Sequence, residues 1–236
     1  AVYRLLTELL PQKYNIEATL VDTSNVEEVK KAIRPNTKLI HIETPGNPII
    51  TISDIEAIAD VAHEKGILLS VDNTFASPYN QLASDLGADL VVESLTKYIN
   101  GHGDAMGGAV LGRRELIDRI RKEAMINVGG AISPFNAWLI MRGAVTLPFR
   151  MKQHNESALT IARYLENHPK VSFVSYPGLE SHPQHEVAKK QMSGYSGLIS
   201  FGLNADFDAH NRFVAGLKVI TSAVSLGHDE SLIVFL

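Results

Sequence analysis

The feature that most constrains the fold is an alternation of short apolar runs with helical patterns between residues 38 and 112. The runs have the length and composition of buried parallel strands and lie at 38–42, 67–71 and 90–92. Ser53 and Glu56 form a capping box, and the same segment carries an apolar stripe at helical spacing: Ile55, Ile58, Ala59 and Ala62. We therefore expect an α/β fold built on a mostly parallel sheet.

The stretch after the third run combines two hydroxyls, a lysine and a glycine-rich loop. Ser94 and Thr96 stand close to Lys97, and the loop follows at 101–104. Open α/β sheets build their sites at the carboxyl ends of strands. Desolvation there favours the neutral amine of lysine, the form that attacks a carbonyl, and the hydroxyls can hold an anion. The stretch suggests a Schiff base between Lys97 and pyridoxal phosphate (PLP); a solvated lysine in a flexible loop is the alternative that it leaves open.

An aspartate at the end of the preceding run favours the cofactor interpretation. Asp72 directly follows the run at 67–71. PLP chemistry needs a carboxylate against the pyridine nitrogen, because a protonated ring is the electron sink for a substrate carbanion. Taken alone, an aspartate in this position is more often a capping or turn residue. Together, Asp72 and Lys97 can face the two ends of one ring.

Two other kinds of site were weighed against this one. A dinucleotide loop is disfavoured, because the glycines at 101, 103 and 107 are wrongly spaced and a strand follows where that fingerprint needs a helix. His182 and His185 lack a third ligand nearby, so we interpret them as a solvated helix start rather than a metal site. We expect His102 to satisfy backbone groups and give it no catalytic role.

Composition excludes several classes of partner. The 236-residue chain has a net charge of −4 and no basic run, so we expect no nucleic-acid partner. It has no apolar stretch of membrane-spanning length and no signal peptide, so we expect no membrane partner and a cytoplasmic location. It contains no cysteine, which excludes disulfides, thiolate metal sites and a cysteine nucleophile within this chain.

The remaining patterns predict further elements on either side of the lysine stretch. Before it we expect a helix at 1–10, a turn at 11–14, a strand at 16–21 and a helix at 25–33. After it we expect a strand at 108–111, then helices at 114–126, from 134, and from 148 to about 168. Strands at 171–175 and 198–203, a helix at 207–217 and an apolar run at 219–224 complete the chain.

Several of these segments resemble the successive signatures of one enzyme family. The segments are Glu43-Thr44-Pro45-Gly46-Asn47-Pro48, the run from Val71 to Tyr79, and Ser94-Leu95-Thr96-Lys97-Tyr98-Ile99-Asn100-Gly101-His102-Gly103-Asp104. They look like the motifs of the Cys/Met-metabolism PLP enzymes, in that family's order. The resemblance continues through 133–138 and 176–179 to 223–227. That family includes methionine gamma-lyase, cystathionine gamma-lyase, cystathionine gamma-synthase and the O-acylhomoserine sulfhydrylases.

The resemblance implies a fold, a cofactor and a set of site residues. It implies the aspartate-aminotransferase-like fold of PLP-dependent transferases (fold type I), with a large PLP-binding domain at 1–148 and the start of a C-terminal α+β domain at 149–236. Lys97 would form the Schiff base with PLP, and Asp72 would pair with the pyridinium nitrogen. Ser94 and Thr96 would bind the phosphate, and Asn47 would lie near the phenolic oxygen of the cofactor or the substrate carboxylate.

The resemblance also implies an activity and an assembly. The loop Gly101-His102-Gly103-Asp104 and the long C-terminal match look more like methionine gamma-lyase than like the synthases. This resemblance implies γ-elimination of a thiol from L-methionine or a related amino acid, giving 2-oxobutanoate and ammonia. Cystathionine gamma-lyase, and the γ-replacement reactions of cystathionine gamma-synthase and O-acylhomoserine sulfhydrylase, are the alternatives. We also expect a homodimer or a tetramer built from dimers.

The chain departs from the family pattern in two respects. The tyrosine that stacks on the cofactor and the arginine that binds the substrate carboxylate do not occur in it at matching positions, so we expect the chain to be part of a longer protein. Glu93 stands where many members of the family carry histidine. Neither departure changes a residue that we assign to chemistry.

Overall fold

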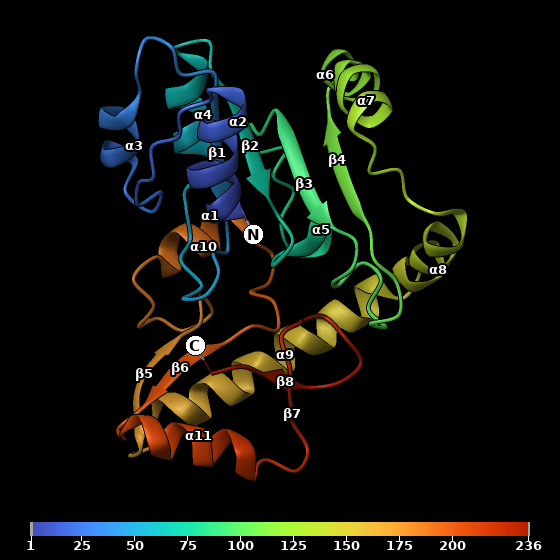
Figure 1. The fold of residues 1–236 in the computed structure, drawn as a ribbon. Coiled ribbons are helices and arrows are strands. Elements are labelled where there is room, and N and C mark those ends of the chain that lie inside the picture. The colour runs from blue at the N-terminus through green and yellow to red at the C-terminus, as the bar shows by residue number, and fades with distance from the viewer. Residues whose placement is uncertain (1, 236) are drawn as a thin grey trace.

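The computed structural model describes residues 2–235, and its main sheet has four strands in the order β1-β2-β3-β4 (Figure 1). The strands are β1 Leu39–Glu43, β2 Leu68–Asp72, β3 Leu90–Ser94 and β4 Gly108–Gly112. The first three are parallel, and β4 runs antiparallel to β3. This arrangement confirms the predicted α/β fold with a mostly parallel sheet, and it brings the carboxyl ends of β1, β2 and β3 to one edge.

One face of the sheet packs against α4 (Ile55–His63), the helix predicted between the first two strands. The buried layer combines alternate strand residues with the apolar stripe of the helix: Ile42, Leu69, Val71, Val91, Ile55, Ile58 and Ala62. Burying one such isoleucine or leucine side chain contributes roughly 1.5–3 kcal/mol. Because side chains alternate along a strand, this packing sets positions 41, 43, 70 and 72 on the opposite face.

The N-cap of α4 is Asp54 rather than Ser53. A carboxylate oxygen of Asp54 accepts a hydrogen bond from the backbone N–H of Ala57 over 3.0 Å. The Ser53 hydroxyl instead pairs with the Thr23 hydroxyl at 2.8 Å. The predicted capping box is therefore wrong by one residue, because a partner remote in sequence engages the side chain of Ser53.

The segment before the sheet departs most from expectation. Residues 2–14 are helical, through α1 (Val2–Arg4), η1 (Leu5–Leu9) and α2 (Leu10–Tyr14), while Ala1 lies outside the described residues. The predicted turn at 11–14 is wrong, because Pro11 occupies the first turn of α2, where its missing N–H is not needed. The strand predicted at 16–21 is also wrong. Its side chains Ile16 and Leu20 are about half exposed, and no described strand pairs with it. The helix predicted at 25–33 is confirmed as α3 (Val26–Ala32), capped by Asn25.

A run of helices follows β4. The helix predicted from residue 114 is present as α6 (Arg114–Ile120), η2 (Arg121–Met125) and α7 (Ile126–Val128). It ends at Gly129 and Gly130, which both have positive φ. The next helix, α8 (Pro134–Ala144), begins at Pro134 as predicted.

The long helix α9 (Leu147–Glu166) leads away from the sheet to a second group of elements (Figure 1). There β5 (Val171–Ser175) pairs antiparallel with β6 (Ser200–Leu203), and α11 (Phe207–Gly216) follows. Ala158 and Ala162 of α9 pack in one buried cluster with Tyr176 and Leu179, which follow β5. The strands and the helix predicted in this region are confirmed. The apolar run at 219–224 forms only the short β7 (Thr221–Ser222), which pairs with β8 (Leu232–Ile233). The domain division at residues 148 and 149 stays a prediction.

Candidate active site

The carboxyl ends of the parallel strands gather acidic and hydroxyl side chains on the face opposite α4. Glu43 at the end of β1 lies in register with Asp72 at the end of β2, and β3 ends at Ser94. Asp72 is half-buried, and one of its carboxylate oxygens accepts a hydrogen bond from the backbone N–H of Thr74 over 3.0 Å. No described residue donates to the other oxygen. The sheet thus holds the Asp72 carboxylate in place and leaves one oxygen able to meet a ligand.

Two further polar residues share the face of Asp72. Burial raises the pKa of Glu43, the negative charge of Asp72 raises it further, and a hydrogen bond from the backbone of Asn47 opposes both. His41 lies 3.1 Å from the Ser70 hydroxyl, and burial lowers its pKa. Sequence reasoning missed Glu43 and His41 as members of the site. The alternation of polar residues at 41 and 43 along a strand was the signal that could have found them.

The side chain of Asn47 is exposed in the loop that follows β1. Its backbone, not its amide, makes the contact with Glu43 described above. A backbone pairing of Gly46 with Thr51 closes this loop beside the strand ends. The loop therefore places Asn47 at the same sheet edge as Asp72. Its contact with a cofactor or substrate stays a prediction.

Lys97 lies in the tight turn that follows β3. Its backbone N–H donates to Ser94 O over 3.1 Å, and its carbonyl accepts from the N–H of Gly101 over 2.8 Å. Its Nζ donates to the Ser225 hydroxyl over 3.1 Å, and that hydroxyl lies 2.9 Å from Nε2 of His228. Sequence reasoning included 223–227 among the family-like segments but gave neither Ser225 nor His228 a role.

The two hydroxyls proposed to bind phosphate are engaged differently. The backbone N–H of Ser94 donates to the Thr74 hydroxyl over 2.8 Å, and the Ser94 hydroxyl itself has no hydrogen-bond partner among the described residues. The Thr96 hydroxyl donates to Gly107 O and accepts from Gly107 N–H, at 3.2 and 3.0 Å. Ser94 is thus free to meet an anion, whereas Thr96 closes the lysine loop. A phosphate contact by Thr96 stays a prediction. To donate to a phosphate, the Thr96 hydroxyl would have to give up its hydrogen bond to Gly107 O.

The glycines of the lysine loop are required by close packing. Gly101 has a φ of +73°, and a Cβ at this position would collide with the guanidinium of Arg150. That guanidinium donates to Tyr98 O over 2.6 Å and to Gly143 O over 2.9 Å, so it ties the loop to α8 and α9. The loop is therefore held by protein contacts and is not the flexible loop that the sequence left open.

A buried chain of amides lies on the other side of the strand ends. Asn73 donates to Glu93 over 2.8 Å, and Gln81 donates to Asn73 over 2.8 Å and to Thr44 O over 3.0 Å. These four residues are at most 3% exposed. Burial raises the pKa of Glu93 to about 7, and the charge of Asp72 adds to this effect while the hydrogen bond from Asn73 opposes it.

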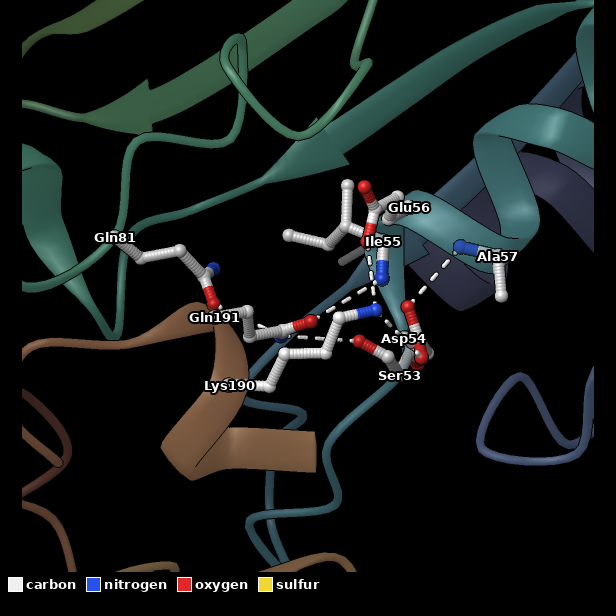
Figure 2. A network of polar contacts seen from close by, with 8 residues as sticks. All are labelled: Ser53, Asp54, Ile55, Glu56, Ala57, Gln81, Lys190 and Gln191. Atoms are coloured by element: carbon white, nitrogen blue, oxygen red, sulfur yellow. Dashed lines mark hydrogen bonds and ion pairs between the residues drawn. The ribbon is translucent and has the colours of Figure 1, made fainter. Parts of the chain in front are cut away.

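Gln191 extends this chain to α10 (His185–Gln191), as Figure 2 shows. Its amide donates to Gln81 over 3.0 Å and to Ser53 O over 3.1 Å, and it accepts from the N–H of Ile55 over 3.2 Å. The neighbouring Lys190 forms an exposed ion pair with Glu56, 2.6 Å apart. Helix α10 is thus bonded to the start of α4 and, through Gln81 and Asn73, to the strand end that carries Asp72.

The histidines considered as ligands have structural roles. His102 lies 2.7 Å from Asn100 O through Nδ1, the backbone role predicted for it. The solvated helix start predicted at 182–185 is wrong for His182, which is 4% exposed and lies 3.1 Å from Ile50 O through Nε2. Within residues 2–235, no three His, Cys, Asp or Glu side chains are grouped so as to hold a metal ion. None of the helices described there has the length and apolar character needed to cross a membrane.

The side chains at this edge fit PLP by their chemistry. Lys97, Asp72 and Ser94 lie at adjacent strand ends. They supply an amine able to form a Schiff base, a carboxylate and a hydroxyl, and within residues 2–235 one oxygen of the carboxylate and the hydroxyl have no hydrogen-bond partner. These are the groups that a cofactor with an aldehyde, a pyridine nitrogen and a phosphate requires.

Comparison with known proteins agrees with this chemistry. The model of the family described as Cys/Met metabolism PLP-dependent enzyme matches residues 1–235. The chain is 56% identical over 236 residues to a canavanine gamma-lyase of Rhizobium leguminosarum bv. trifolii, covering 99% of this chain and 59% of that protein. It is 48% identical over 223 residues to an L-methionine gamma-lyase of Fusobacterium nucleatum subsp. nucleatum, covering 94% and 56%.

The likeness extends to solved structures. The crystal structure of cystathionine gamma-lyase from Lactobacillus plantarum complexed with L-serine superposes with a TM-score of 0.94 at 40% identity, covering 99% of this chain and 61% of that one. The chain thus spans about three-fifths of the length of the relatives it matches. The matches to the family model and to these relatives show that the chain belongs to the Cys/Met-metabolism family of PLP-dependent enzymes, with pyridoxal phosphate as cofactor.

Proposed function

We propose that the protein is a PLP-dependent γ-lyase, which removes a leaving group from the γ-carbon of an amino acid. One observation carries the proposal. Asp72 ends β2 and Lys97 follows β3, and these two strands pair in parallel, so both residues lie at one sheet edge. Nζ of Lys97 donates a hydrogen bond to the Ser225 hydroxyl. In this proposal Lys97 forms the Schiff base and Asp72 holds a proton on the pyridine nitrogen.

In this proposal each side chain at the sheet edge has a separate role. When bound, PLP withdraws electrons from the substrate α-carbon. The free amine of Lys97 would take the proton from Cα and pass it on, and it would then remove a second proton from Cβ. Ser94 and Thr96 hold the phosphate, and Asn47 orients the cofactor or the substrate carboxylate. A single lysine can serve both carbons in turn, so the elimination needs no second base.

The leaving group defines the substrate. We propose L-methionine or a related γ-substituted amino acid, following the lysine-loop resemblance. L-canavanine is a specific second candidate, supported by the 56% identity to a canavanine gamma-lyase. Both carry a heteroatom on Cγ, so the same proton transfers serve them, and the leaving group would be methanethiol or hydroxyguanidine respectively. Elimination from cystathionine and γ-replacement on O-acylhomoserine are the remaining alternatives.

An assay of the full-length protein separates these substrates. It is incubated in turn with methionine, canavanine, cystathionine and homocysteine, and the released thiol or hydroxyguanidine is measured together with 2-oxobutanoate. A parallel reaction of O-acylhomoserine with a thiol is followed for thioether formation. Release of a γ-leaving group without an added nucleophile supports the lyase proposal. Thioether formation alone contradicts it and assigns the protein to the synthases.

We also propose that the protein is a homodimer or a tetramer built from dimers. The helices after β4 expose large apolar side chains: Ile126 at 69%, Val128 at 83%, Met141 at 65%, Val145 at 74% and Phe149 at 78%. Side chains of this size so exposed are typical of surfaces covered by another polypeptide. Light scattering of the full-length protein tests the proposal, and an active monomer contradicts it. A cytoplasmic location belongs to the same proposal and is tested by cell fractionation.

A further inference from the structure

A hydroxyl and an imidazole from the last part of the chain form a short hydrogen-bonded series with the lysine amine. Lys97 Nζ donates to Ser225 Oγ over 3.1 Å, and Ser225 Oγ lies 2.9 Å from Nε2 of His228. All three side chains are half-buried. A protein hydroxyl therefore separates the imidazole from the amine that would react with PLP.

His228 is seated against the lysine loop itself. Gly103 of that loop has a φ of +67°, and a Cβ there would lie 2.9 Å from Nδ1 and 3.0 Å from Cε1 of the imidazole. A side chain at residue 103 would push the ring away from Ser225. The glycine and the imidazole thus fit together, and the lysine loop fixes the position of the ring.

The hydrogen-bond capacity of serine makes this arrangement directional. A serine hydroxyl has one proton to donate and two lone pairs that accept. When the Ser225 hydroxyl donates its hydrogen bond to Nε2 of His228, a lone pair of the hydroxyl oxygen points toward Lys97. That lone pair accepts a hydrogen bond from an N–H of the lysine amine. The lone pair on Nζ of a neutral Lys97 is then left for a carbonyl carbon. Without an acceptor at residue 228, the hydroxyl can rotate and donate to the same lone pair.

We propose that His228 is a positioning residue that, as the neutral Nδ1–H tautomer, accepts the Ser225 proton and thereby keeps the lone pair of Lys97 available to the PLP aldehyde. The inference rests on the proposed function, in which Lys97 forms the Schiff base. His228 touches neither cofactor nor substrate in this scheme and acts only through Ser225.

The test measures Schiff-base formation rather than turnover. PLP is added to the cofactor-free full-length protein, and the growth of the visible absorption band gives a rate constant. One net hydrogen bond is worth about 1 kcal/mol, so we expect His228→Leu to slow the reaction roughly fivefold. His228→Gln places an amide oxygen near the position of Nε2 and is expected to stay within about twofold of the wild type. In a Ser225→Ala background, His228→Leu should leave the rate unchanged, because the hydroxyl that it orients is absent.

Three results overturn the proposal. His228→Leu is compared in both backgrounds, and equal slowing with and without the Ser225 hydroxyl shows that the ring acts by packing alone. No slowing in the wild-type background shows that it has no role. If His228→Leu does not fold, His228→Asn replaces it, because its shorter amide cannot reach Ser225; equal rates for the Asn and Gln variants then overturn the proposal. Lys97→Ala is the separate control, and a visible band that persists in this variant contradicts the proposed function instead.

Discussion

Asp72 and Lys97, the two residues assigned to the chemistry, are held in different ways. Asp72 ends a central strand, its carboxylate is bonded to the backbone two residues on, and its neighbours Asn73 and Glu93 lie in a buried chain of amides. The amine of Lys97 is half-buried and contacts Ser225, which comes 128 positions later in the chain. Sheet geometry therefore fixes the carboxylate, whereas the docking of a remote segment fixes the amine.

Substitutions near Asp72 and near Lys97 should therefore have different effects. Around Asp72, a change of one atom can alter charge without altering position, because the backbone of β2 stays paired on both sides. Around Lys97, a substitution at or near Ser225 changes the hydrogen bond of the lysine amine and leaves the lysine loop intact. Substitutions near Asp72 should change the turnover rate and the pH dependence of the protein. Substitutions near Ser225 should change the rate at which the Lys97 amine reacts.

Asp72→Asn is expected to have the largest effect. The amide is nearly isosteric and still accepts from Thr74, but it cannot hold the pyridine nitrogen protonated. We expect kcat of the full-length enzyme to fall roughly a hundredfold or more with an unchanged melting temperature. Near-normal turnover in this variant would show that Asp72 is a turn residue, and a large loss of stability would show that its role is structural.

Glu93→Gln tests the buried carboxyl near the end of the neighbouring strand, β3. The folded-state pKa of Glu93 is about 7, above its ordinary value of 4.5, so wild-type stability falls as the pH rises from about 4.5 to about 7. The full effect is at most about 3 kcal/mol. Glutamine still accepts from Asn73 and does not ionise. We therefore expect the variant to lose less stability across this range and to exceed the wild type above about pH 7, measured by urea unfolding. Parallel stability curves for the two proteins would contradict the buried-carboxyl interpretation.

Gln191→Leu tests whether α10 is bonded to the site edge, with a smaller expected effect. The substitution leaves Gln81, Ser53 and Ile55 each without one hydrogen-bond partner, so we expect a loss of about 1–2 kcal/mol in unfolding free energy. Lys190→Ala is the matched control on the same helix, because it removes an exposed ion pair worth about 0–1 kcal/mol. An equal effect of the two variants would show that the buried chain adds nothing beyond the surface contact.

The sequence predicted those features that depend on neighbouring residues. Apolar runs indicate the strands at the sheet edge, and Asn25 caps the helix that directly follows it. The same local patterns place Asp72 and Lys97 at strand ends, while their chemical roles stay predictions. The strand expected at 16–21 is absent because an alternating pattern needs a partner strand, and none lies beside Ile16 and Leu20. His182 lies within hydrogen-bond distance of Ile50 O, and Lys97 donates to Ser225. Each contact joins residues more than 120 positions apart, and local sequence patterns carry no information about such pairs.

The most direct test of the account is the chemical identity of the lysine that carries the cofactor. The full-length protein is loaded with PLP, reduced with borohydride and digested, and the modified peptide is sequenced by mass spectrometry. We predict a pyridoxyl group on Lys97 and no visible absorption band in Lys97→Ala. Modification of a different lysine, with the band retained in Lys97→Ala, would contradict it.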